Sequence, residues 1–175
     1  MIASMNSILF WLVKTVYRRT APRLAFLLEG SHRKTVHEYL HHAGKVNDFR
    51  QEFARYWREQ KLDLMVTPGF GSQACLHGYS ETTSLAAAYT FIWNVLGTTV
   101  GAMPITVTRE DEEVYESKHN DDITTKLNET VKGSAGMPVG IQVVGLPFED
   151  EKVLGLMKSL EKEVKFYEKF PLPKV

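Results

Sequence analysis

Three short apolar runs, separated by segments with helical patterns, constrain the fold of this 175-residue chain more than any other feature. They lie at 62–66, 100–108 and 136–145, next to Gly and Pro residues. Apolar runs of this length, interrupted by Gly and Pro, are typical of buried strands. Buried strands separated by helices predict an α/β fold in which helices pack on a sheet.

Three helices are expected around these strands. Residues 32–60 carry apolar side chains at three- and four-residue spacing, with Ser31 as the expected N-cap. Residues 85–96 follow the capping cluster Thr82-Thr83-Ser84. A last helix is expected to begin at residues 149–151, because the helix dipole favours acidic side chains in the first turn. Its expected inner face consists of Val153, Leu154, Met157, Leu160 and Val164.

Composition excludes several classes of protein. Hydrophobic residues make up 43% of the chain, and 21 basic side chains balance 21 acidic ones, which argues against a generally cationic nucleic-acid binder. Cys75 is the only cysteine, so neither a disulfide framework nor a cysteine zinc site is expected. His37 and His41 lie one helical turn apart but lack a third ligand at suitable spacing, and we predict no metal and no cofactor.

The acid-rich stretch 109–122 is expected to be a solvated excursion with some helix.

The first 30 residues combine apolar bulk with positive charge. The run 8–13, which contains Trp11, is followed by basic residues, and the segment holds four Lys or Arg residues against one acid. This pattern suits amphipathic helices lying in a membrane interface. The same face would equally suit packing on protein, and the pattern alone leaves both interpretations open.

No catalytic site emerges from the pattern of residues. Ser134 lies in a Gly-flanked turn, but the sequence pairs it with no base. Cys75 and His77 are too close in sequence for a favourable thiolate–imidazole geometry. The loop 69–72 lacks the Lys of a phosphate-binding loop.

Four segments in register resemble the amidase signature family, and within it the fatty acid amide hydrolases. The most specific is Gly136-Met137-Pro138-Val139-Gly140-Ile141-Gln142, similar to the family's Gly-x-Pro-Val-x-x-Gln run. The others are the strand ending in Thr67-Pro68, the Tyr-Thr…Asn helix at 88–94 and the proline-containing strand at 100–106. The resemblance covers residues 8–165 and corresponds to the C-terminal third of the family's domain.

The resemblance implies a partial amidase-type mixed sheet with packed helices, preceded by amphipathic helices. Residues 1–30 would be a membrane-cap-like segment and residues 31–175 the C-terminal part of an amidase domain. The family hydrolyses amides, and its fatty acid amide hydrolases hydrolyse lipid amides. Its Ser-Ser-Lys triad lies in a Gly/Ser-rich region that precedes the part of the domain that this chain resembles. No residue of this chain matches that triad, so the chain is expected to be inactive alone.

The resemblance also assigns residues. Ser84, Ala87 and Phe91 would line the acyl channel, and Phe10, Trp11, Phe26 and Leu27 would belong to the membrane cap. The implied partners are a membrane surface, a lipid amide in a complete enzyme and a possible second copy, with an intracellular, peripheral-membrane or cytoplasmic location. Two alternatives stay open, namely a non-catalytic lipid-binding module and one subunit of a split amidase.

Overall fold

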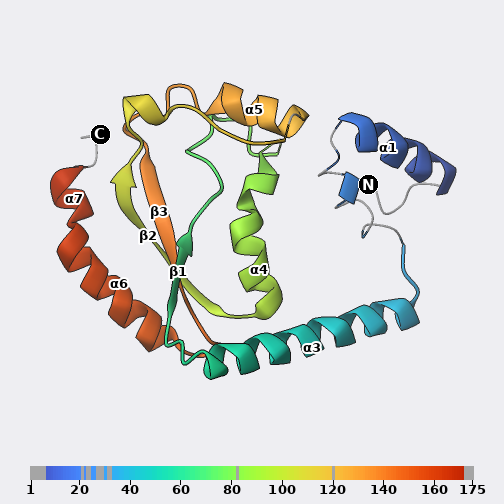
Figure 1. Cartoon of the computed structure of the whole chain (residues 1–175), viewed down its shortest axis with the longest axis horizontal. Helices are drawn as coiled ribbons and strands as arrows, with labels where there is room; N and C mark the ends of the chain where they lie inside the picture. The colour runs from blue at the N-terminus through green and yellow to red at the C-terminus, as the bar shows by residue number, and fades with distance from the viewer. Residues whose placement is uncertain are drawn as a thin grey trace.

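The computed structural model describes residues 7–20, 22, 25, 26, 30, 33–81, 83–119 and 121–171 of the chain (Figure 1). The described elements are, in chain order, the helices and strands α1 (Ser7–Thr20), α3 (Val36–Glu59), β1 (Met65–Pro68), η2 (Ser84–Ala87), α4 (Ala88–Leu96), β2 (Thr99–Val107), η3 (Glu110–Glu112), α5 (Asp122–Thr130), β3 (Pro138–Gly145), α6 (Asp150–Val164) and α7 (Phe166–Lys169).

Strand β3 is the centre of a three-stranded sheet with the order β1-β3-β2. Both neighbours run antiparallel to it, and Val143 lies opposite Val66 on one side and Gly101 on the other. The ladder with β2 is irregular between Pro104 and Thr106. The expected α/β class with helices on a sheet is therefore confirmed. Both pairings are antiparallel, so the described residues do not contain the parallel pairings that a mixed sheet would add.

Helix α6 covers one face of this sheet, as Figure 1 shows. A Cβ atom built on Gly101 would lie 3.0 Å from Val153 Cγ1 and would overlap Met157 Sδ, and one on Gly145 would lie 3.0 Å from Val153 Cγ2. The helix thus approaches the strands closely because two residues beneath it have no side chain. Val153 and Met157 contribute to the predicted inner face, but Leu154 is 61% exposed, and its assignment to that face is wrong.

The opposite face of the sheet packs against α4 and the end of α3. Trp57, Trp93, Leu96 and Val144 form a buried cluster there. The Phe53 ring lies between the two indoles, with centroid distances of 5.6 Å to Trp57 and 6.3 Å to Trp93. Aromatic groups at these distances contribute through both burial and ring contacts.

The C-terminus of α4 is fixed by two further features. Arg50 Nε donates a hydrogen bond of 2.6 Å to the Val95 carbonyl, which joins α3 to the last turn of α4. Gly97 follows with φ of 68°, the left-handed conformation common after helices. The expected end of this helix at Gly97 is confirmed.

The expected start of the long helix at residue 32 is wrong. Helix α3 begins at Val36, and Thr35 is its N-cap. Thr35 Oγ1 accepts from Glu38 N at 3.2 Å, and Glu38 Oε2 accepts from Thr35 N at 2.7 Å, which makes a reciprocal capping box. Ser31, the expected cap, lies outside the described residues.

Two other boundaries also differ from expectation. The 85–96 helix starts as the 3-10 turn η2, and α4 follows with Ala87 at its N-cap and no side-chain cap, so neither Thr83 nor Ser84 of the predicted capping cluster caps it, while Thr82 lies outside the described residues. Thr83 Oγ1 instead donates to the Tyr79 carbonyl at 2.9 Å. Strand β1 starts at Met65 rather than at 62, because Lys61, with φ of 53°, turns the chain after α3.

The acid-rich stretch is partly structural rather than only solvated. Besides the short turn η3, Glu113 Oε1 accepts a hydrogen bond of 2.7 Å from Ala135 N. The Ala135 and Gly133 amides lower the pKa of Glu113, because they stabilise its charged form. Helix α5, capped by Asp121 Oδ1 accepting from Thr124 N at 3.0 Å, has no counterpart among the expected elements.

Gly101→Ala should lower the free energy of unfolding by about 1–3 kcal/mol, because the new methyl group would push α6 away from the sheet. Gly155→Ala in α6 is the control, since a Cβ there has no atom within 4 Å. We expect that control to be neutral or stabilising, and urea unfolding followed by circular dichroism measures both. Equal stability of the two variants would contradict the close packing of α6.

Candidate functional site

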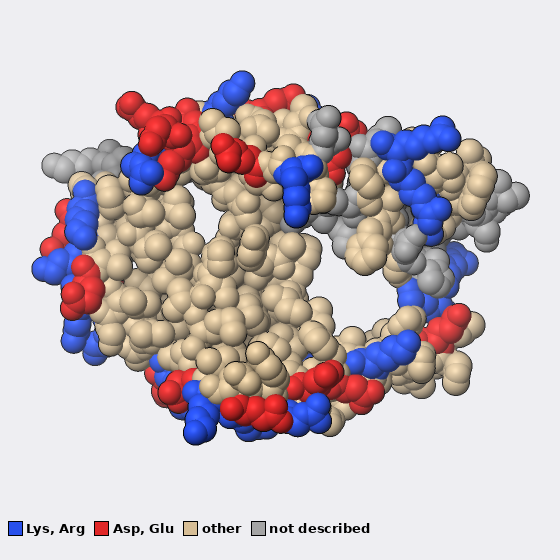
Figure 2. Space-filling model, viewed as in Figure 1, with Lys and Arg blue, Asp and Glu red and all other residues tan. Residues whose placement is uncertain are grey.

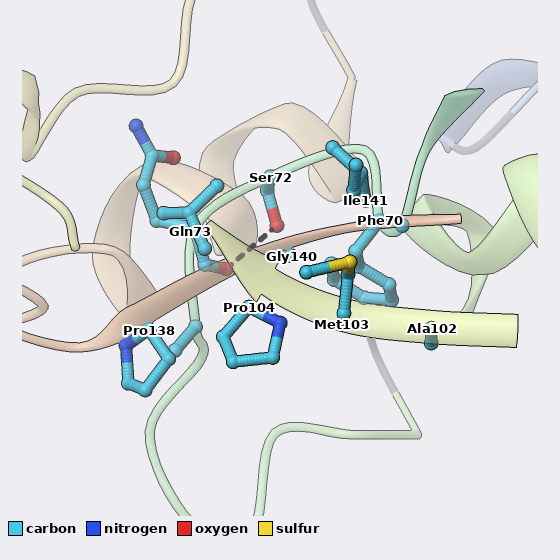
Figure 3. A pocket seen from close by; sticks show the side chains of 12 residues that line it. Phe70, Ser72, Gln73, Ala102, Met103, Pro104, Pro138, Gly140 and Ile141 are labelled. Atoms are coloured by element: carbon cyan, nitrogen blue, oxygen red, sulfur yellow. Dashed lines mark hydrogen bonds between the residues drawn. The ribbon is translucent and has the colours of Figure 1, made fainter. Parts of the chain in front are cut away.

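A cleft opens where the loop 69–74 faces the strands β2 and β3. One pocket of about 410 Å³ is lined by this loop, by residues 102–104 of β2 and by residues 138–141 of β3. Figure 3 shows Phe70, Ser72 and Gln73 from the loop together with Met103, Pro104 and Pro138 from the strands. A second pocket of about 400 Å³ shares several of these residues and extends to 112–116. We call the two together the loop cleft.

Backbone hydrogen bonds hold the loop over the sheet. Gly69 N donates to the Gly140 carbonyl at 3.3 Å, and Gly71 N donates to the Ala86 carbonyl at 2.8 Å. A Cβ on Gly71 would lie 3.0 Å from the Ala86 carbonyl oxygen, so this approach needs glycine. Gln73 Nε2 donates to the Glu112 carbonyl at 2.5 Å, which ties the loop to the acid-rich stretch.

Gln142 joins β1, β3 and α4 beside this cleft. Its side chain is 5% exposed, and Nε2 donates to the Pro68 carbonyl at 2.7 Å and to the Tyr89 carbonyl at 3.3 Å. Both partners are acceptors, so the nitrogen, not the oxygen, must face them. The sequence contains Gln142 in its most specific motif, but the motif alone assigns it no role. Strand alternation places it on the α4 face with Val144.

The chemistry of the loop cleft is that of a binding surface. Its lining is largely apolar near Met103 and Ile141, and carboxylates enter only at the far end through Glu112 and Glu116. Ser72 Oγ donates to the Gln73 carbonyl at 3.0 Å. Neither pocket is lined by Lys or His, and the Ser72 hydroxyl donates to a backbone carbonyl rather than to one of these carboxylates.

The other nucleophile candidates have no basic partner among the residues that the structure describes. Ser134 is 3% exposed, and its hydroxyl has no hydrogen-bond partner there. Cys75 is half-buried, whereas His77 is exposed. Within the same described ranges, no group of three or more His, Cys, Asp or Glu side chains gathers as a metal site would require.

The predicted channel residues lie along η2 and α4. Ser84 is exposed, Ala87 is half-buried and Phe91 is 45% exposed. The spacings of three within η2 and four into α4 keep them on one side of the helical segment. None of the three lines either pocket of the loop cleft. Their assignment to an acyl channel remains a prediction.

The predicted cap residues lie in the first part of the chain. Phe10 in α1 is half-buried, Trp11 is 64% exposed and Phe26 is 76% exposed, whereas Leu27 lies outside the described residues. Arg18 and Arg19 occupy the last turn of α1. Across the described ranges, no helix has both the length and the apolar character to cross a membrane.

Comparison with known proteins identifies the family of this chain. The sequence model of the family Amidase matches residues 11–154. The chain belongs to the Amidase family. This confirms the family resemblance of the four sequence motifs.

Two relatives are fatty acid amide hydrolases. The chain is 29% identical to "Fatty-acid amide hydrolase 1" of Sus scrofa over 155 residues, which cover 86% of this chain and 27% of that protein. It is 28% identical to "Fatty acid amide hydrolase 1" of Caenorhabditis elegans over 143 residues, which cover 80% of this chain and 25% of that protein. The amidase chain described here therefore spans about a quarter of the length of these relatives.

A solved structure shares the fold. A chain named "Fatty acid amide hydrolase" superposes with a TM-score of 0.56 at 20% identity, over 78% of this chain and 25% of that one. At this identity the likeness concerns the fold, and it agrees with the α/β arrangement described above.

Gln142→Leu should lower the free energy of unfolding by about 1–3 kcal/mol, because it removes both hydrogen bonds to the Pro68 and Tyr89 carbonyls. Gln51→Leu on the exposed side of α3 is the control and should change stability much less. Urea midpoints of the two variants give the comparison. If Gln142→Leu lowers the free energy of unfolding by no more than the control does, the hydrogen bonds that link β3 to β1 and α4 contribute little to stability.

Proposed function

We propose that this chain is the C-terminal part of an amidase resembling the fatty acid amide hydrolases. The reaction of the complete enzyme would be hydrolysis of lipid amides, such as N-acylethanolamines and primary fatty amides, to fatty acid and amine. The observation that carries this proposal is the Amidase match over residues 11–154, together with the two relatives named for that activity.

The Ser-Ser-Lys triad would come from the part of the amidase domain that precedes the matched segment. Ser134 has a buried hydroxyl without a hydrogen-bond partner among the described residues, and the Ser72 hydroxyl donates to the Gln73 carbonyl. This chain would therefore contribute binding surface and not the nucleophile.

The remainder of the domain would pack on the surfaces that this chain leaves open. Its accessible area is 12666 Å², against about 8,700 Å² expected for a compact monomer of this mass. Figure 2 shows charge confined to the periphery of the visible face and an uncharged region across its middle. Exposed apolar side chains lie on α3 and α4, among them Val36, Leu40, Tyr89, Phe91, Ile92 and Val95.

In the assembled enzyme, the α4 side of the sheet would contribute part of the acyl channel. Ser84, Ala87 and Phe91 follow one another on η2 and α4, and the exposed Phe91 ring offers apolar contact area for an alkyl chain. The hydrogen bond of Thr90 Oγ1 to the Ala87 carbonyl, at 2.7 Å, holds the junction of the two helical turns.

A chimera tests the proposal. We expect pig fatty-acid amide hydrolase 1 with its matching segment replaced by this chain to hydrolyse oleamide and to react with a fluorophosphonate probe for activated serines. The chain alone should do neither, because it would lack the nucleophile.

The controls are the heat-denatured chain and the pig enzyme without the segment. Labelling of the native chain alone would place a nucleophile within it and contradict the proposal. A folded chimera without activity would contradict it too. Activity after mixing the chain with the truncated pig enzyme would favour the split-subunit alternative.

A second candidate function is binding to a membrane surface, with the protein peripheral to an endomembrane. The observation that favours it is the exposure of Trp11, Leu12 and Val16 on α1, a helix with Arg18 and Arg19 in its last turn. Exposed aromatic and aliphatic groups beside basic residues suit insertion into a lipid interface.

Trp11→Ala should weaken binding to vesicles of phosphatidylcholine and phosphatidylserine by about tenfold, because the indole would no longer be transferred into the interface. Tyr39→Ala is the matched control, since Tyr39 is 65% exposed and Trp11 is 64% exposed. Vesicle sedimentation measures both. Equal binding of the two variants, or loss of all binding in 1 M salt, would contradict insertion of α1.

A further inference from the structure

An apolar groove lies between α6, α7 and the edge strand β2. It has a volume of about 540 Å³, within the range of small-molecule sites. Met157 and Val164 of α6, Met103 of β2 and Phe166 of α7 form most of its apolar lining. Phe166 is 5% exposed, whereas Leu154 at the rim is 61% exposed.

This groove is separate from the predicted acyl channel. Side chains of successive strand residues point to opposite faces, so Met103 and Val143 lie on the α6 face while Gln142 and Val144 lie on the α4 face. Ser84, Ala87 and Phe91 belong to the α4 side, and none of them lines the groove.

The apolar groove continues into a charged pocket. A neighbouring pocket of about 560 Å³ shares Lys158, Glu161, Phe166 and Tyr167 with the groove and adds Lys162, Lys165 and Glu168. Three lysines thus surround the charged end, against two glutamates. Lys165 is paired with Glu168 at 3.7 Å, whereas no ion pair holds Lys158 or Lys162 among the described residues.

We infer that this groove binds a long-chain carboxylate, with its alkyl chain along Leu154, Met157 and Phe166 and its carboxylate near Lys158 and Lys162. An alkyl chain gains from contact with the apolar lining. A carboxylate gains from the two lysine ammonium groups, whereas a cationic head group would meet an excess of lysines over glutamates. The inference uses only the groove and does not depend on the proposed function.

The test measures how tightly the full-length chain binds oleate and methyl oleate, and records the methyl resonances of the methyl-labelled chain. We expect oleate to bind more tightly than methyl oleate and to shift the Leu154, Met157 and Val164 methyl resonances. The double variant Lys158→Gln, Lys162→Gln should weaken oleate binding roughly two- to fivefold per lysine and leave methyl oleate binding unchanged. Leu154→Gln should weaken binding of both ligands by about tenfold.

Leu40→Gln is the matched control, because Leu40 is 62% exposed on α3 and Leu154 is 61% exposed. It should bind both ligands as the unmodified chain does, and circular dichroism checks that every variant is folded. Equal affinity for oleate and methyl oleate would overturn the carboxylate assignment. Oleate binding unaffected by Leu154→Gln, or Leu154 shifts that follow chain concentration rather than oleate, would overturn the site.

Discussion

Strand β3 hydrogen-bonds to a neighbour along both of its edges and is covered by helices on both of its faces, and the other elements take their places from it. Val143 and Val144 are both 0% exposed, although their side chains point to opposite faces. On the Val143 face, the missing side chains of Gly101 and Gly145 let α6 approach. On the other face, Val144 packs with the indoles of α3 and α4.

The same strand organises both binding surfaces. Its first half lines the loop cleft, and Gln142 links it to β1 and α4 through two backbone carbonyls. Its pairing with β2 positions Met103 beside α6 and α7, where the apolar groove lies. β1 and β2 each keep an outer edge that no described strand pairs, and α4 presents Tyr89, Phe91 and Ile92 outward. A piece of a larger amidase domain would have such surfaces, because its neighbours in the domain cover them.

Strong local signals made much of the fold predictable. Apolar runs between Gly and Pro predicted all three strands, and Gly97 marked the end of α4. The start of α3 was also present in the sequence, because Thr35 has Glu38 three residues later while Ser31 has Lys34 there. The role of Gln142 and the groove beside α6 depend on contacts between distant segments. No spacing within one element could therefore have predicted them.

Amide hydrogen exchange, compared between the isolated chain and the pig enzyme chimera, tests most directly whether the chain is one part of an amidase domain organised by β3. In both proteins, residues 138–145 should exchange slowly, because β3 is paired and covered within the chain itself. In the chimera, α4 and β1 should become protected as the rest of the domain covers them. If α4 and β1 exchange equally fast in both proteins, or if β3 exchanges as fast as α1 in the isolated chain, the account is contradicted.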